Sequence, residues 1–437
     1  MTNSDSYDRA FVRTEMLPEK APPPGETGPV HWLRDNLFSS ATNTVLTLVA
    51  IYLVAKFVAA VFPWVVFGVW DAGSLSECRE ILMAEYGNTG YACWAVLSER
   101  WNQLIFGFYP QELYWRPILA FVLLFVALAP LLFDHLPRKM VIFSAIYPFL
   151  MYQLIWGGSV WFPVTVIAGF VIGYYAPKII APVAGDLAGI IAMLLAPVLW
   201  WLFLAGPVAG VLQDIIPLSM EAVRSKTLGG FMISVVIGLS GIALSLPIGI
   251  MLALGRQSDL LIVKTICVGF IEFIRGVPLI TLLFTASLLL QYFLPKGTNF
   301  DIVVRVIIMV TLFASAYMAE VIRGGLAALP RGQYEAADAL GLNYWQAQKL
   351  IIMPQALKIS IPGIVNTFIG LFKDTTLVIF IGIFDILGLT NTLRATTAWN
   401  GIYWELFIFV AVVFWVCCFS MSQYSQWLER KLRTDHV

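Results

Sequence analysis

Charged residues are scarce in this chain of 437 residues. Asp, Glu, Lys and Arg make up 12% of it, hydrophobic residues make up 59%, and the mean hydropathy is +0.81. A soluble globular domain has about 25% charged residues, so this composition excludes an ordinary soluble fold and indicates an integral membrane protein. The formal net charge is zero and no basic face stands out, which argues against nucleic acid as a partner.

Histidine, cysteine and nucleotide-binding motifs are also scarce. The three histidines, His31, His135 and His436, are far apart, and the five cysteines show no metal-ligand spacing, so we expect neither a metal site nor a histidine-based catalyst. The chain has no Gly-x4-Gly-Lys-Ser/Thr phosphate loop, the usual element of ATP-hydrolysing proteins. We therefore expect no bound cofactor and no enzymatic activity. Any energy from ATP would come from a partner.

Long apolar runs predict an all-α polytopic membrane protein with about ten transmembrane helices. Five spans are expected in the first half, at 43–66, at 117–133, as a pair within 140–177 separated by Gly157 and Gly158, and at 187–213. Five more are expected at 227–255, 261–291, 302–325, 360–388 and 404–424, the second of them bent by Pro278. A re-entrant hairpin within 140–213 would give eight spans instead.

The distribution of Lys and Arg predicts the orientation of these spans. With an even number of spans both termini lie on one side, and the tails and loops of that side hold about 16 Lys and Arg against about 8 on the other. Because positive residues favour the cytoplasm, the N-terminal tail 1–35, the polar segment 326–358 and the C terminus are predicted to be cytoplasmic. The tail has no apolar run that could act as a cleavable signal peptide.

A polar island at Arg331–Ile359 separates two of the predicted spans. Glu335, Ala336 and Ala337 begin a short helix in which two small side chains stand side by side, so another surface can approach its backbone closely. Gly341 supplies the turn that ends this helix.

A second helix of the island is predicted to start at Asn343, with Gln346 at the capping-box position, and to end at Pro354. The island thus contains Glu-Ala-Ala, three residues, Gly341, nine residues, Ile351, one residue, Met and Pro. In this pattern the chain resembles the membrane-spanning permease subunits of bacterial ABC importers. Their cytoplasmic loop carries Glu-Ala-Ala-x3-Gly-x9-Ile-x-Leu-Pro and docks a separate ATPase subunit. Met for Leu is a nearly volume-conserving departure.

Two further segments, IEFIRGVPL at 271–279 and AYMAEVIRGG at 316–325, resemble the polar-amino-acid branch of that family. The resemblance covers roughly 220–430 and implies a five-helix permease core with the ATPase-docking loop at 326–358. Residues 36–213 would then be an N-terminal transmembrane extension. Its segment WLRDNLF looks like the longer subunits of general L-amino-acid importers, relative to which 159–210 looks like an insertion.

The resemblance implies a multi-pass subunit of the bacterial inner membrane that imports L-amino acids. The partners it implies, besides lipid, are an ABC ATPase dimer, a second permease subunit in a heterodimer rather than a homodimer, and a periplasmic amino-acid-binding protein. An ion-gradient-driven secondary transporter is the alternative, but it predicts an inverted repeat and no ATPase dock. A membrane-embedded enzyme would need a constellation such as paired His and Asp in a span, and none is visible.

The predicted periplasmic loop 71–116 is net acidic and contains Cys78 and Cys93, the only cysteines outside the apolar spans. Because the bacterial periplasm is oxidising, we predict a disulfide between them, which would stabilise the loop by up to roughly 3 kcal/mol. Two free thiols are the alternative.

Ionisable residues within spans are the candidates for a substrate path, because each is costly in hydrocarbon unless it is paired or hydrated. Glu272 lies roughly 16 Å into its predicted span, near the midplane, and Arg275 is three residues further on, so the two can pair on one helix face. Glu320 and Arg323 repeat this spacing near the end of a span, where a structural ion pair is expected.

Lys373 and Asp374 are adjacent, so on a helix they point about 100° apart and cannot neutralise each other across one face. At least one of them must face a polar cavity or another subunit. An aspartate with a cationic partner suits a free amino acid, which carries an ammonium and a carboxylate. We therefore predict a path lined by Glu272, Arg275, Lys373, Asp374 and Thr375, with buried ion pairs as the alternative.

Overall fold

The computed structural model describes residues 28–133, 135–289, 292 and 301–432. This part is helical apart from two short antiparallel strands, β1 (Gly158–Ser159) and β2 (Ser219–Met220), and their connections. Nine of its helical runs are long and apolar enough to cross a membrane, and a sharply bent pair brings the number to as many as ten. The prediction of an all-α polytopic membrane protein is confirmed.

The five predicted spans of the first half are all present as helices. They are α2 (Ala41–Val66), α5 (Trp115–Leu132), α6 (Val141–Trp156), α7 (Trp161–Ala184), and a run made of α8 (Asp186–Leu199), a π turn (Trp200–Leu204) and α9 (Ala205–Ile215). The chain breaks between α6 and α7 at Gly157 and Gly158, whose φ angles of 66° and 83° favour glycine. Because α6, α7 and the α8–α9 run are each long and apolar enough to be a span, the described residues favour ten spans over eight.

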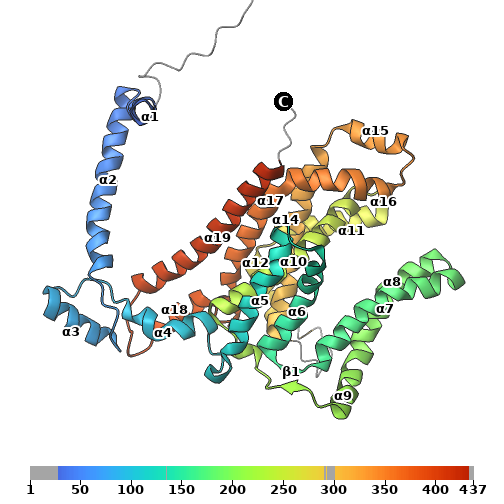
Figure 1. Cartoon of the computed structure of the whole chain (residues 1–437), viewed down its shortest axis with the longest axis horizontal. Helices are drawn as coiled ribbons and strands as arrows, with labels where there is room; N and C mark the ends of the chain where they lie inside the picture. The colour runs from blue at the N-terminus through green and yellow to red at the C-terminus, as the bar shows by residue number, and fades with distance from the viewer. Residues whose placement is uncertain (1–27, 134, 290–291, 293–300, 433–437) are drawn as a thin grey trace, which may run out of the picture.

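Four long helices of the second half form the centre of the molecule (Figure 1). They are α10 (Gly230–Arg256), α14 (Ile302–Ala327), α17 (Met353–Asp374) and α19 (Trp404–Leu432). Glycines of α10 allow α14 to approach closely, since a Cβ at Gly249 would lie 2.7 Å from the Cβ of Met318. Gly241 faces Val310 in the same way, so α10 and α14 run parallel.

The predicted span 261–291 is a broken pair rather than one gently bent helix. α11 (Leu261–Gly276) is inclined by 103° to the run formed by α12 (Leu279–Phe284) and a π turn. The break falls at Val277, whose extended backbone is the conformation favoured before Pro278. Because α10 and α14 are parallel, the chain between them has to return from one end of the bundle to the other. Counting the broken pair as one span brings the candidate membrane spans of the described residues to ten.

The polar island folds into α15 (Arg331–Ala339) and α16 (Tyr344–Ala347), and Figure 1 shows it at the same end of the molecule as α1 (Pro29–Leu37). The prediction that Pro354 ends the second helix is wrong. A π turn at Gln348–Ile352 joins α16 to α17 without a break. Pro354 follows this π turn, whose wider hydrogen-bonding pattern accommodates a residue that has no N–H.

The segment 71–116, predicted as a loop, is folded. It contains α3 (Leu75–Tyr86) and α4 (Ala95–Phe106), and a disulfide joins Cys78 of α3 to Cys93 just before α4. These helices share an apolar cluster with α18 (Ile386–Leu393) and the start of α19. The segment 71–116 of the N-terminal extension therefore shares a hydrophobic cluster with the C-terminal half.

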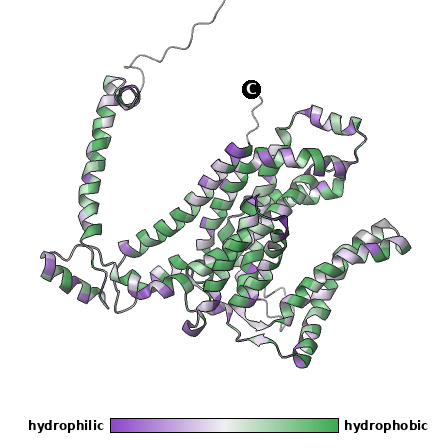
Figure 2. Ribbon diagram, viewed as in Figure 1, coloured by the Kyte–Doolittle hydropathy of each residue, from purple (hydrophilic) through white to green (hydrophobic). Residues whose placement is uncertain are grey.

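Two buried polar contacts fix this layer to the bundle. The indole N–H of the fully buried Trp399 donates to Glu99 Oε2 at 2.8 Å. The backbone N–H of Cys93 donates to Glu405 Oε1, also at 2.8 Å, across a sequence separation of 312 residues. Figure 2 shows mainly hydrophobic residues along α2, α7 and α8 and hydrophilic residues on α3 and α15. The hydrophobic helices fit a lipid environment.

Candidate functional site

The island presents the candidate docking surface. Its first helix ends as predicted, because Gly341 has φ +68° and its N–H donates to Asp338 O at 2.9 Å, while Leu342 N–H donates to Ala337 O at 3.2 Å. These two bonds make a Schellman motif, which needs a left-handed residue at the glycine position. The predicted capping box of the second helix is present as well, between Asn343 and Gln346.

The small residues of the island divide between two faces. Glu335 and Ala336 are exposed, whereas Ala337 is fully buried and so cannot itself contact a partner. The prediction that Ala336 and Ala337 together form one open surface is therefore wrong. Large apolar side chains are exposed instead, led by Leu340 at 72% and Trp345 at 71% exposure. A partner protein that covers this surface would bury them, and sequence reasoning missed them because it weighed only the motif positions.

Five charged residues meet where α10, α11 and α14 come together at the island end of the bundle. Arg256, the last residue of α10, places Nη1 2.9 Å from Glu272 Oε1 of α11 and 2.7 Å from Glu320 Oε1 of α14. Arg323 Nε lies 3.1 Å and Arg275 Nη1 3.7 Å from Glu320 Oε2. Three guanidinium groups and two carboxylates give the cluster a net charge of +1, and it ties three helices together.

This cluster corrects two predictions. Glu272 is not near the midplane, because it contacts the terminal residue of α10 at the island end. Its ion-pair partner is Arg256 rather than the predicted Arg275, which lies closest to Glu320. The predicted pair of Glu320 with Arg323 is present. Arg256 was missed because the predicted span ended at residue 255 and because its partners are 16 and 64 residues away in sequence.

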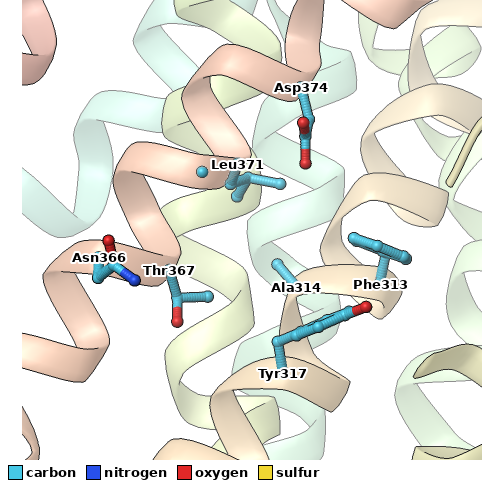
Figure 3. Close-up of a pocket in the computed structure, with 8 residues that line it drawn as sticks. Phe313, Ala314, Tyr317, Asn366, Thr367, Leu371 and Asp374 are labelled. Carbon is cyan, nitrogen blue, oxygen red and sulfur yellow. The ribbon is translucent and has the colours of Figure 1, made fainter.

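A cavity of about 300 Å³ lies between α14 and α17. Its walls are Phe313, Ala314 and Tyr317 of α14 and Asn366, Thr367, Gly370, Leu371 and Asp374 of α17. Figure 3 shows the carboxylate of Asp374 and the rings of Phe313 and Tyr317 around the same space. The volume is at the lower end of the range of small-molecule sites, and the polar groups are few, as is usual for such sites.

The two adjacent charges point in different directions, as their spacing requires. Asp374 lines the cavity, whereas Lys373 is exposed and is not part of its wall. No hydrogen bond or ion pair to the Asp374 carboxylate occurs within the described residues, so a ligand in the cavity could supply one. Thr375 does not line the cavity either. It is fully buried, and its hydroxyl donates to Phe372 O at 2.7 Å.

The cavity and the charged cluster meet at Tyr317. Its ring forms part of the cavity wall, and the guanidinium carbon of Arg275 lies 5.7 Å from the ring centroid. A cation at this distance is attracted to the aromatic face. Tyr317, Asn366 and Thr367 are cavity residues that sequence reasoning did not single out, because uncharged polar side chains within a span are common and give no distinct signal.

Comparison with known proteins gives a consistent result along the whole chain. Residues 245–434 match the family described as binding-protein-dependent transport system inner membrane component. The chain is 58% identical to the glutamate/glutamine/aspartate/asparagine transport system permease protein BztC of Rhodobacter capsulatus, over 98% of this chain and 99% of that protein. It is 38% identical to the inner membrane amino-acid ABC transporter permease protein YhdY of Escherichia coli, over 93% of this chain and 94% of that one.

A solved structure, the crystal structure of an amino acid ABC transporter with histidines, matches 46% of this chain and 92% of its own, with 29% identity and a TM-score of 0.42.

Proposed function

This chain belongs to the family of amino-acid ABC transporter permeases, and from that premise we propose how it works. As a member it is a multi-pass membrane component of binding-protein-dependent import, not an enzyme and not an ion-gradient-driven transporter. Permeases of this kind work with ATPase subunits and binding proteins. In this protein α15 and α16 would contact the ATPase, through the exposed surface that includes Leu340 and Trp345.

The orientation follows from the positive-inside rule. The island, α1 and the end of α19 lie at one end of the molecule, and we assign that end to the cytoplasm of a bacterial cell, with both termini there. The layer of α3, α4 and α18 is then periplasmic and faces the amino-acid-binding protein. A second permease subunit of different sequence would complete the translocation path, which opens alternately to either side as the ATPase subunits close.

The observation that carries the substrate assignment is the cavity lined by Asp374. A free amino acid brings an ammonium that can pair with this carboxylate, which has no described partner. Tyr317, Asn366 and Thr367 offer hydroxyl and amide groups to the rest of the molecule. The relative from Rhodobacter capsulatus is named for glutamate, glutamine, aspartate and asparagine, and we propose this class of L-amino acids for the present chain.

Replacing Asp374 with Asn tests the assignment, since it keeps the size of the side chain and removes the charge. We expect uptake of radiolabelled glutamate and glutamine by membrane vesicles to fall by about tenfold or more, because the charge-assisted bond to the ammonium is lost. Assembly of the complex and basal ATP hydrolysis should be unchanged.

Lys373→Met provides the matched control, because Lys373 is the neighbouring charge and lies outside the cavity. It should leave uptake close to the wild-type rate. Wild-type uptake in Asp374→Asn would move the site elsewhere. Depletion of the complex from the membrane in Asp374→Asn would instead identify Asp374 as part of a structural ion pair.

A further inference from the structure

α2 stands apart from the other membrane helices. None of its 26 residues is buried, although it is the most hydrophobic of the described spans. Figure 1 shows α2 separated from α19 and the rest of the bundle, with α1 beside its upper end and the α3 and α4 layer at its lower end. A helix inside a compact bundle buries one face against other helices. Within the described residues α2 has no such helix packed along it, whereas every other described span has buried residues.

The position of α2 is fixed by packing at its lower end. The indole N–H of Trp94 donates to Val65 O at 3.0 Å, and the rings of Trp94 and Trp64 are 5.4 Å apart. Trp94 follows Cys93, which is held to the bundle by Glu405. The lower end of α2 therefore packs against the layer of α3 and α4, which is itself bound to the bundle.

Lys56 lies deep in this helix. It is 15 residues after Ala41 and 10 before Val66, so its Cα is about 22 Å from one helix end and about 15 Å from the other. A lysine side chain reaches only about 6 Å towards the N-terminal end of its helix, too little to leave a hydrocarbon layer of about 30 Å. Its described contact is weak, since Nζ is 5.9 Å from the centroid of the Tyr52 ring. A charge at this depth is costly against lipid and requires a partner.

Lys56 marks one side of α2. At 100° per residue, Tyr52, Lys56, Ala59 and Ala60 lie on this side, together with Val45 and Val49 nearer the start of the helix. The opposite side carries the bulky apolar residues Ile51, Val54, Val58 and Val65, together with Thr47. Small and polar residues mark helix contacts in membranes, and bulky aliphatic residues suit lipid.

We propose that the Lys56 face of α2 packs against a transmembrane helix of the second permease subunit, and that this helix carries an acidic side chain opposite Lys56. This proposal rests on the pairing of permeases proposed above. A second copy of this chain fits poorly. Of its acidic residues in described spans, Glu272 and Glu320 already pair with Arg256, and Asp374 lines the cavity. The others lie in the first or last turn of a span.

Photocrosslinking in the assembled complex tests the contact. A benzophenone amino acid placed at Ala60, on the Lys56 face, should crosslink to the second permease, and the same probe at Val58, on the opposite face, should not. Lys56→Met should lower the amount of second permease that co-purifies with this chain by about tenfold or more, because the acidic group is left unpaired. Lys56→Arg should retain it, and Val58→Met is the matched control for a methionine in the same turn.

Crosslinks from Ala60 to this chain's own helices, to a second copy of it or only to lipid would overturn the proposal, as would unchanged recovery in Lys56→Met. If the wild-type chain co-purifies with no second permease at all, the proposed pairing of permeases fails together with this contact. Recovery of the second permease without a crosslink from α2 refutes the α2 contact alone.

Discussion

The Schellman turn at Gly341 is the point at which the proposed ATPase dock can be weakened without a steric clash. A Cβ built there has no atom within 4 Å, so Gly341→Val introduces backbone strain alone. A β-branched residue that keeps φ +68° costs about 1–3 kcal/mol. The alternative is to unwind the turn, which loses its two hydrogen bonds at about 1 kcal/mol each. By either route the shape of the α15 end is destabilised by about 2 kcal/mol, a factor of about 30 in equilibrium constant.

The assay is the recovery of the ATPase subunit with the purified permease and the stimulation of its ATP hydrolysis. Both should fall about 30-fold at limiting ATPase if α15 must hold this shape to bind, whereas insertion of the permease into the membrane should not change. Gly332→Val is the matched control, since Gly332 is exposed in the same helix, also has no atom within 4 Å of a built Cβ, and has no left-handed backbone. Normal ATPase recovery and stimulation in Gly341→Val would show that α15 is not the dock.

Two further predictions concern the ends of the bundle. Glu320→Gln should destabilise the detergent-solubilised protein by about 2–3 kcal/mol in thermal unfolding, because it leaves three guanidinium groups around a neutral side chain that is 16% exposed. Glu272→Gln, at a site that is 54% exposed, should cost less than about 1 kcal/mol, and equal effects of the two changes would contradict this account. Cys78 and Cys93 should resist a thiol-labelling reagent in non-reduced membranes and react after reduction, and labelling of both without reductant would rule the bridge out.

The membrane helices were predictable because their signals are local. An apolar run of sufficient length, a pair of glycines at 157–158 and a capping box at Asn343 each specify a structure within a few residues. The 103° break at Pro278 was underestimated, because proline predicts a bend whereas its size depends on what the two halves pack against. The fold of 71–116 was missed for the same reason, since α3 and α4 are stabilised by residues about 300 positions later in the chain.

The candidate site was predictable only in part. The divergence of Lys373 and Asp374 follows from helix geometry alone, but that geometry does not say which of the two faces the cavity. Of the predicted path residues only Asp374 lines it. Charge partners did not follow from spacing. Glu272 lies three residues from Arg275 yet contacts Arg256, because the approach of α10 brings a closer guanidinium from another helix.

Packed side chains connect the proposed ATPase-docking helices α15 and α16 to the cavity at Asp374. The π turn after α16 buries Ile352 in an apolar cluster that also holds Ala253 of α10 and Met318 of α14. Met318 is adjacent in sequence to Tyr317. The Tyr317 ring lines the cavity and makes a cation–π contact with Arg275 of the charged cluster. A displacement of the island by an ATPase subunit would therefore act on one wall of the cavity through contacts that resist compression. α17 supplies the other wall and continues directly from the same π turn, so both walls of the Asp374 cavity are joined to the surface that the ATPase is proposed to move.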